Sequence, residues 1–156
     1  MTPITLDYIK AEHTRLANLI ASFEAQEASE IHFPETLIAL QPGEHYAGLI
    51  IGKDGEPSYH LVLLPGDEES ITWDKAMTWA AQRGSLDAVA SLPTRREQAL
   101  LYANLKEQFE SAWYWSSEAH ESDSGYAWYQ HFGLGYQSST LKGYVCRARA
   151  VRRLPI

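Results

Sequence analysis

Residues 111–153, SAWYWSSEAHESDSGYAWYQHFGLGYQSSTLKGYVCRARAVRR, are the stretch that decides the fold. They hold half of the chain's aromatic residues, interleaved with serine and glycine rather than with aliphatic residues. Tyrosine and tryptophan bury a large area with few rotatable bonds, and serine and glycine adapt their hydrogen bonding, so this mixture is typical of a recognition surface. The same rings are also compatible with the core of a β-rich domain, because alternation along a strand sends one set inward and the other outward.

Three strands are expected in this stretch, at WYWSS (113–117), GYAWYQHF (125–132) and YVCRARAVRRL (144–154). In the middle strand the heavier apolar face, with Tyr126, Trp128, Gln130 and Phe132, is predicted to point inward, and the face with Ala127 is predicted to point outward. The outward rings and the polar residues after the 133–135 turn are the ligand-binding candidates: Tyr129, His131, Tyr136, Ser138, Ser139 and Tyr144.

The last of these strands carries two kinds of side chain. Cys146, Ala148 and Ala150 form a small-residue face that is expected to pack closely on the core. The arginines of RARAVRR (147–153) are expected to lie on a solvated face and to pair with acidic residues.

Upstream, local signals predict a three-stranded meander and two helices. The meander spans residues 31–64, with a hairpin turn at 53–55, and the acidic run 67–69 is expected to be a solvated loop. One helix is predicted from Trp73 to about residue 82, with Thr72 as its N-cap. The second begins at a capping box formed by Thr94 and Glu97, and buries Leu101 and Leu105.

The N-terminal segment has the a/d spacing of an amphipathic helix, capped by Thr5. We expect residues 1–29 to be a separate helix and residues 30–156 to be the main domain, and no function is inferred for residues 1–60. A helix of about three heptads is marginal alone, so its seam should pack either on its own domain or on other copies of the chain. In the second case it forms a homo-oligomer, with His13 as a polar layer between apolar residues: Leu6, Ile9, Leu16, Ile20 and Phe23.

Composition limits the classes of function. The net charge of −7 and the pI near 5.3 argue against nucleic acid as a partner. A single cysteine, Cys146, excludes an internal disulfide, and neither a signal peptide nor a membrane span is evident, so we expect the bacterial cytoplasm or a phage particle as the location. The histidines lack metal-ligand spacing, and no cofactor motif is present. Catalysis would have to depend on Cys146 or on the loop with His120, Glu121 and Asp123.

Several of these segments together resemble a known family. LPTRREQALLYANL (92–105), AWYWSSEAHESDSGYAWYQHFGLGYQSS (112–139) and RARAVRR (147–153) are similar to the phage and prophage domain-of-unknown-function family 1566, also called the Lcl C-terminal-like domain. The resemblance covers about residues 60–154. It implies an α+β, C-type-lectin-like fold in which two helices pack on twisted antiparallel strands, here preceded by the amphipathic helix.

The resemblance also implies a function. Members of this fold group include ligand-binding domains, and some are diversified by retroelements near the C-terminus, in the place that residues 131–146 occupy here. The calcium-dependent sugar motifs of animal lectins are absent from the sequence, and so are the paired cysteines of formylglycine-generating enzymes. We therefore expect a non-enzymatic protein that binds a protein or a cell-surface glycan, either for host attachment or as a diversified receptor. The alternatives are an intracellular accessory protein that binds a host or phage protein and, less favoured, a hydrolase or redox enzyme.

Overall fold

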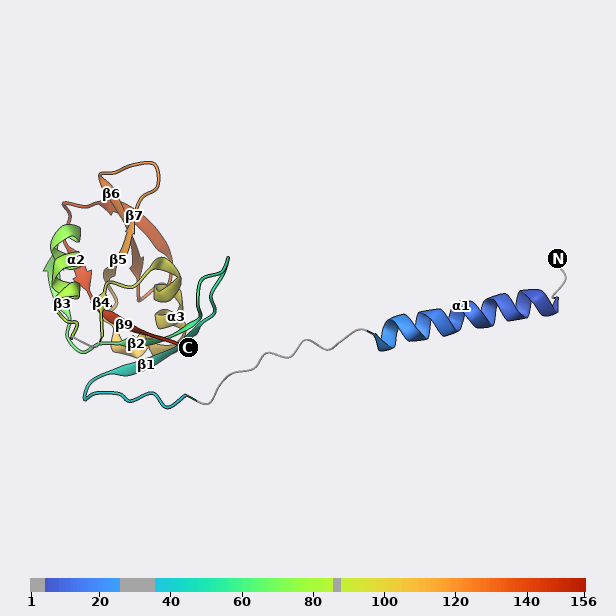
Figure 1. Cartoon of the computed structure of the whole chain (residues 1–156). Coiled ribbons are helices and arrows are strands. Elements are labelled where there is room, and N and C mark those ends of the chain that lie inside the picture. The colour runs from blue at the N-terminus through green and yellow to red at the C-terminus, as the bar shows by residue number, and fades with distance from the viewer. Residues whose placement is uncertain (1–4, 26–35, 86–87) are drawn as a thin grey trace. The chain divides into compact units, whose positions relative to one another are not determined.

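The computed structural model describes residues 5–25, 36–85 and 88–156, and divides the chain into two units, residues 1–35 and 36–156 (Figure 1). The boundary expected after residue 29 lies in the segment 26–35, outside the described residues. The second unit contains both helices and strands, which confirms the α+β class.

The first unit contains one helix, α1 (Leu6–Glu24). Its start is the predicted one, because the Thr5 hydroxyl accepts a hydrogen bond of 3.2 Å from the backbone N–H of Tyr8. The helix buries none of its own residues, and Phe23 at the end of the seam is 74% exposed. Among the described residues, no helix is long and apolar enough to cross a membrane.

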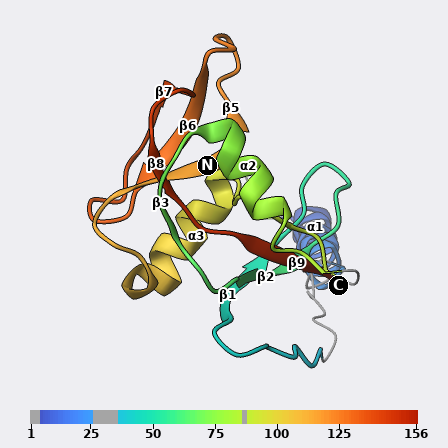
Figure 2. The same cartoon turned by 90° about the vertical axis from the view of Figure 1, so that its left-hand side faces the viewer.

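The second unit is built from two sheets and two α-helices (Figures 1 and 2). Strand order is β1-β2-β9-β4 in one sheet and β3-β8-β5-β6-β7 in the other, and all pairings are antiparallel except β5 with β8. The helical elements are α2 (Trp73–Ala81), α3 (Arg95–Leu105) and the 3-10 turn η1 (Lys106–Gln108). The strands are β1 (His45–Ile50), β2 (Tyr59–Leu63), β3 (Glu68–Ile71), β4 (Ala90–Ser91), β5 (Trp113–Ala119), β6 (Tyr126–His131), β7 (Gln137–Leu141), β8 (Cys146–Ala148) and β9 (Val151–Pro155).

The predicted meander is only partly present. β1 and β2 form a hairpin whose turn places Asp54 and Gly55 at φ of 54° and 88°, the left-handed backbone that such turns require. Residues 36–41, predicted to be a strand, have no strand conformation, and residues 31–35 lie outside the described part of the chain. On the side away from β1, β2 pairs with β9 instead of with a third strand of the meander.

The predicted last strand is two strands in different sheets. β8 pairs with β3 and β5, whereas β9 lies between β2 and β4, so the chain crosses from one sheet to the other at residues 149–150. The small-residue face is confirmed, because Ala148 and Ala150 are fully buried and Cys146 packs beside them.

The arginines pair with acidic residues as expected, but the face that carries them is not fully solvated. The acidic run 67–69 is solvated only in part, because Glu69 is exposed and Asp67 is not. Arg149 and Arg152 are buried, and Asp67 is partly buried where it pairs with Arg147 at 3.2 Å. Residues 68–71 are the edge strand β3 rather than a loop. Burial is tolerated because each cation has acceptors: Arg152 pairs with Glu44, while Arg149 binds two backbone carbonyls.

Both α-helices of the second unit pack against the sheets and contribute to the core. α3 packs against β1 of one sheet and against β5 and β6 of the other, and α2 packs near β3, β4, β5 and β8. Ala76 and Ala80 of α2 and Leu101 and Leu105 of α3 are buried as predicted. Two core clusters result, one around Leu101, Tyr114 and Phe132 and one around Trp115, Ala127 and Ala148.

Glu97 is the centre of a buried polar network. The Thr94–Glu97 capping box forms as predicted, but the carboxylate of Glu97 also receives Nε and Nη2 of Arg153 at 2.6 and 2.7 Å and the hydroxyl of Tyr59 at 2.6 Å. Glu97 is fully buried. Burial alone raises the pKa of this carboxyl, but the hydrogen bonds and charge of Arg153 outweigh it and hold the pKa below 4.5.

We predict that Glu97→Gln lowers the free energy of unfolding by about 3 kcal/mol, because it leaves Arg153 without its counter-charge. Urea unfolding at pH 7 measures the change. Since the pKa of Glu97 is lowered in the folded state, the stabilisation is complete above pH 4.5 and is lost as the pH falls through the folded value, so the difference between parent and variant should shrink in acid. The control is Glu107→Gln at an exposed position of η1. Equal losses in both variants would contradict the assignment.

Candidate functional site

Four rings gather on one face of the second sheet, and we call them the aromatic cluster: Trp113, Tyr129, His131 and Tyr136. Trp113 is at its centre, stacked on Tyr129 with ring centroids 3.9 Å apart and edge-on to His131 and Tyr136 at 5.1 and 5.2 Å. The rings of His131 and Tyr136 are parallel to within 11°, at 6.1 Å. Such offset-stacked and edge-to-face pairs are the favourable arrangements of aromatic side chains.

Strand register creates this cluster. Trp113 of β5 lies opposite His131 of β6, and Trp115 lies opposite Tyr129. These two cross-strand pairs therefore point to the same face of the antiparallel strands. Trp115 continues the row inward, where it is fully buried. Its indole N–H donates to the carbonyl of Ile71 at 2.8 Å. The row therefore runs from the core to the surface.

The turn between β6 and β7 holds the outer edge of the cluster. The Nδ1 atom of His131 accepts the backbone N–H groups of Gly133 and Leu134, each at 3.1 Å, which places the ring proton on Nε2. Gly135 has φ of +86°, and a Cβ there would lie 2.7 Å from the ring of Tyr102, so only glycine fits. The turn thus orients both His131 and Tyr136.

The cluster is anchored at one end and open at the other. Tyr129 is half-buried against the second core cluster, and its pKa is raised by burial and by the neighbouring Cys146 and Tyr136. Tyr136 is 51% exposed, with Trp113 and His131 intermediate. A ligand can therefore reach the edges of rings whose positions are already fixed by packing, which lowers the entropic cost of binding.

The structure brings four of the six predicted contact residues together. Ser138 lies opposite Tyr129 in the β6–β7 register and shares its face, whereas Ser139 lies opposite Trp128 on the other face. Tyr144 is 60% exposed and lies in the connection between β7 and β8, and among the described residues no ring contact joins it to the cluster. These last two residues are not part of the aromatic cluster.

The predicted inward face of β6 is only partly correct. Gln130 and Phe132 are buried as expected, but Trp128 is half-exposed and Ala127, expected outside, is completely buried. The reason is that core clusters cover parts of both faces of this sheet. Trp113 is missing from the predicted contact set, although the alternation in WYW already places it on the face of Trp115 and away from that of Tyr114.

On the opposite face of β6, Trp128 is covered by Arg95 of α3 and by the loop that follows β5. The guanidinium of Arg95 lies 3.5 Å from the centre of the Trp128 ring, and His120 stacks on the same indole at 5.4 Å. Glu121 accepts from the indole N–H at 3.3 Å and pairs with Arg95 at 3.7 Å. His120 and Glu121, the loop residues considered for acid–base chemistry, therefore both contact Trp128. Within residues 5–25, 36–85 and 88–156, no cluster of three or more metal-ligating side chains occurs.

Cys146 lies beneath the aromatic cluster in the second core cluster. Burial raises the pKa of its thiol to about 11. The thiolate is the nucleophilic form of cysteine, so burial lowers the nucleophilic fraction of this side chain at neutral pH.

Comparison with models of known protein families and with curated proteins finds no match to this chain. A function for the chain has to be inferred from the geometry of its described residues.

We predict that Cys146 reacts slowly with iodoacetamide at pH 8, about a hundredfold more slowly in the folded protein than in urea, because raising the pKa of the thiol from 9.0 to about 11 lowers the fraction of thiolate at this pH about a hundredfold. Mass spectrometry of timed samples measures the alkylation. The urea-unfolded chain is the control for intrinsic reactivity. A folded rate equal to or above the unfolded rate would restore Cys146 as a candidate nucleophile.

Proposed function

We propose that this chain is a non-enzymatic ligand-binding protein that uses the aromatic cluster and Ser138 as its contact surface. The observation that carries the proposal is the set of mutually packed rings that opens to solvent at Tyr136. Ring edges, a phenol hydroxyl and the Nε2–H of His131 suit a ligand that presents both apolar and hydroxyl groups, as a glycan or a protein loop does. Aromatic residues of this kind are enriched in protein recognition surfaces.

The architecture of residues 36–156 supports a C-type-lectin-like assignment within this proposal. Two helices pack on mostly antiparallel sheets, and the last strand β9 inserts between β2 and β4. The resemblance to the phage and prophage family supports the same assignment. On this proposal the protein attaches to a bacterial surface, or it is a receptor in which residues 131–146 vary to change the partner.

A protein partner inside the cell is the second candidate, and exposed apolar residues favour it. Leu141, Tyr144 and Val145 lie at the end of β7 and after it, and are 41%, 60% and 59% exposed. Contiguous exposed apolar side chains are common in protein interfaces. On this alternative Tyr144 contributes through a surface separate from the aromatic cluster.

We predict that Tyr136→Ala lowers binding of the labelled protein to bacterial cells or to their extracted surface glycans by at least about tenfold, because truncating an aromatic anchor at a binding hot spot costs about 2 kcal/mol or more. Flow cytometry over a panel of strains measures cell binding. The matched control is Tyr46→Ala, which removes a tyrosine of similar exposure from β1 in the other sheet.

The outcomes of this test are distinct. Loss only in Tyr136→Ala supports attachment through the aromatic cluster. Loss only in Tyr144→Ala moves the contact surface to the β7–β8 connection, against the proposal. An absence of binding by the parent protein to every strain and glycan counts against surface attachment and favours the intracellular partner.

We further propose that α1 joins copies of the chain, since joined copies raise the effective concentration of weak sites. Its seam residues recur at a and d positions, and Leu16 in the middle is 57% exposed. We predict that the parent chain is oligomeric in sedimentation equilibrium, and that Leu16→Glu, which places a charge in the seam, makes it monomeric. The control is Asn18→Glu, at an exposed position outside the seam. A monomeric parent chain would contradict self-association.

A further inference from the structure

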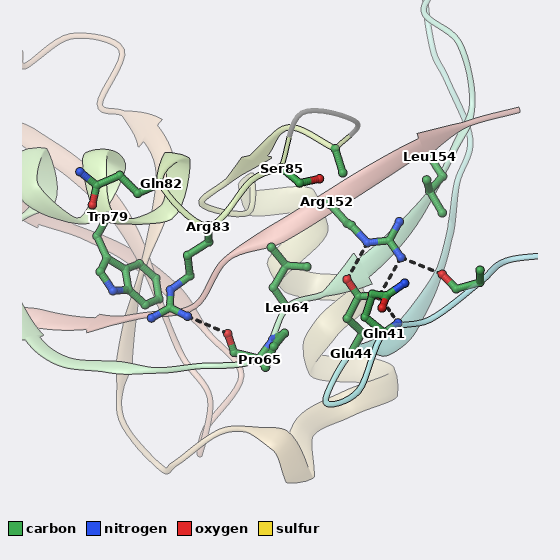
Figure 3. Close-up of a pocket in the computed structure, with 12 residues that line it drawn as sticks. Gln41, Glu44, Leu64, Pro65, Trp79, Gln82, Arg83, Ser85, Arg152 and Leu154 are labelled. Carbon is green, nitrogen blue, oxygen red and sulfur yellow. Dashed lines mark hydrogen bonds and ion pairs between the residues drawn. The ribbon is translucent and has the colours of Figure 1, made fainter.

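A pocket of about 820 Å³ lies in the second unit, away from the aromatic cluster (Figure 3). Its walls come from the segment before β1, from the end of α2 with the residues after it, and from β9. Leu64, the residue after β2, is buried and also lines the pocket. This size falls within the range of about 300–1,000 Å³ that is usual for sites that hold small molecules.

Arg83 is the cation of this pocket that has no carboxylate partner among the described residues. Its guanidinium lies 4.2 Å from the centre of the Trp79 ring, and Nη1 donates to the carbonyl of Pro65 at 3.1 Å, as Figure 3 shows. Stacking and this hydrogen bond hold the side chain in place while the guanidinium keeps further N–H groups that a ligand can use. Guanidinium groups held in this way are suited to binding carboxylates, sulfonates and phosphates.

The opposite wall of the pocket contains an ion pair between Arg152 and Glu44. Nε and Nη2 of Arg152 donate to the two carboxylate oxygens of Glu44 at 2.8 and 2.7 Å, and Nη2 also donates to the carbonyl of Ala39 at 3.0 Å (Figure 3). The hydrogen bond from Arg152 holds the pKa of Glu44 below its ordinary value, so the pair remains ionised at neutral pH. Because this pair cancels its own charge, the net charge of the described lining residues is that of Arg83.

A second cation, Arg149, binds the backbone next to the residue that Arg83 binds. Arg149 is buried, and its Nη2 donates to the carbonyl of Leu64 at 3.1 Å, next to the Pro65 carbonyl that Arg83 binds. Burial is the main cause that lowers the pKa of Arg149; Asp67 and Tyr114 oppose it, and the charge of Arg83 adds a smaller lowering. An anion beside Arg83 would relieve this repulsion. A local positive charge of this kind stands out in a protein whose net charge is −7.

We propose that this pocket binds a small amphipathic anion, with its charged head on Arg83 and a flat apolar body over Leu64 and Trp79. The apolar part of the lining supports the second half of this description, since Leu64, Pro65 and Leu154 are among its residues. A few placed polar groups among apolar ones are the usual composition of a small-molecule site. This site is separate from the aromatic cluster and does not depend on the function proposed for it.

The test uses two fluorescent probes that differ in one charged group. The anion 8-anilinonaphthalene-1-sulfonate and its uncharged analogue N-phenyl-1-naphthylamine are titrated into the full chain. The sulfonate should bind one equivalent, and Arg83→Gln should weaken it by at least about tenfold, the size expected for loss of a charge-assisted hydrogen bond. The same variant should change the affinity for the uncharged probe by less than about twofold.

Three further variants place the site and check specificity. Ala39→Trp, which fills the pocket from its wall, should weaken both probes. Arg96→Gln, at an exposed arginine of α3, and Tyr136→Ala, in the aromatic cluster, should affect neither. Far-ultraviolet circular dichroism confirms that each variant is folded. Equal weakening of the sulfonate by Arg83→Gln and Arg96→Gln, loss in Tyr136→Ala, or sulfonate binding unchanged in Arg83→Gln would overturn the proposal.

Discussion

The buried carboxylate of Glu97 is the constraint on which the rest of residues 36–156 depends. It belongs to the first turn of α3, but its oxygens are bound by Arg153 of β9 and Tyr59 of β2, both in the first sheet. A fully buried charge is tolerated only with complete hydrogen bonding, so this helix, these strands and their register are fixed together. Since α3 also packs on β5 and β6, the same ion pair indirectly positions the strands that carry the aromatic cluster.

Features that depend on neighbouring residues could be predicted from the sequence. The Thr94–Glu97 capping box, the Asp54–Gly55 turn and the start of α1 at Thr5 are confirmed because each uses side chains or backbone within three or four residues. The alternation of small and basic residues runs from Cys146 to Ala150 and is broken by Val151 and Arg152, but this break does not show that the two halves of residues 146–155 join different sheets. Only the distant partners β3, β5, β2 and β4 determine where each half pairs.

The same distinction applies to the candidate site. Alternation along β6 correctly placed Tyr129 and His131 on one face, but it also placed Ala127 outside, because a period of two does not tell whether one face or both are covered. Strand register places Ser139 on the face opposite to the cluster, which nearness in sequence does not reveal. The pocket beside Arg83 was not predictable at all, since its walls come from segments as distant in sequence as Ala39 and Leu154.

The division of the C-terminal segment between the sheets has a kinetic consequence. β8 joins β3 to β5, and β9 joins β2 to β4, so each sheet is interrupted in the middle until this last segment is in place. During synthesis on the ribosome, the strands made earlier would wait with unpaired edges for residues 146–155 to emerge. Pairing of such widely separated segments requires closing long loops first, and this slows folding. The chain is therefore expected to form its sheets late and to need protection from aggregation while it is being made.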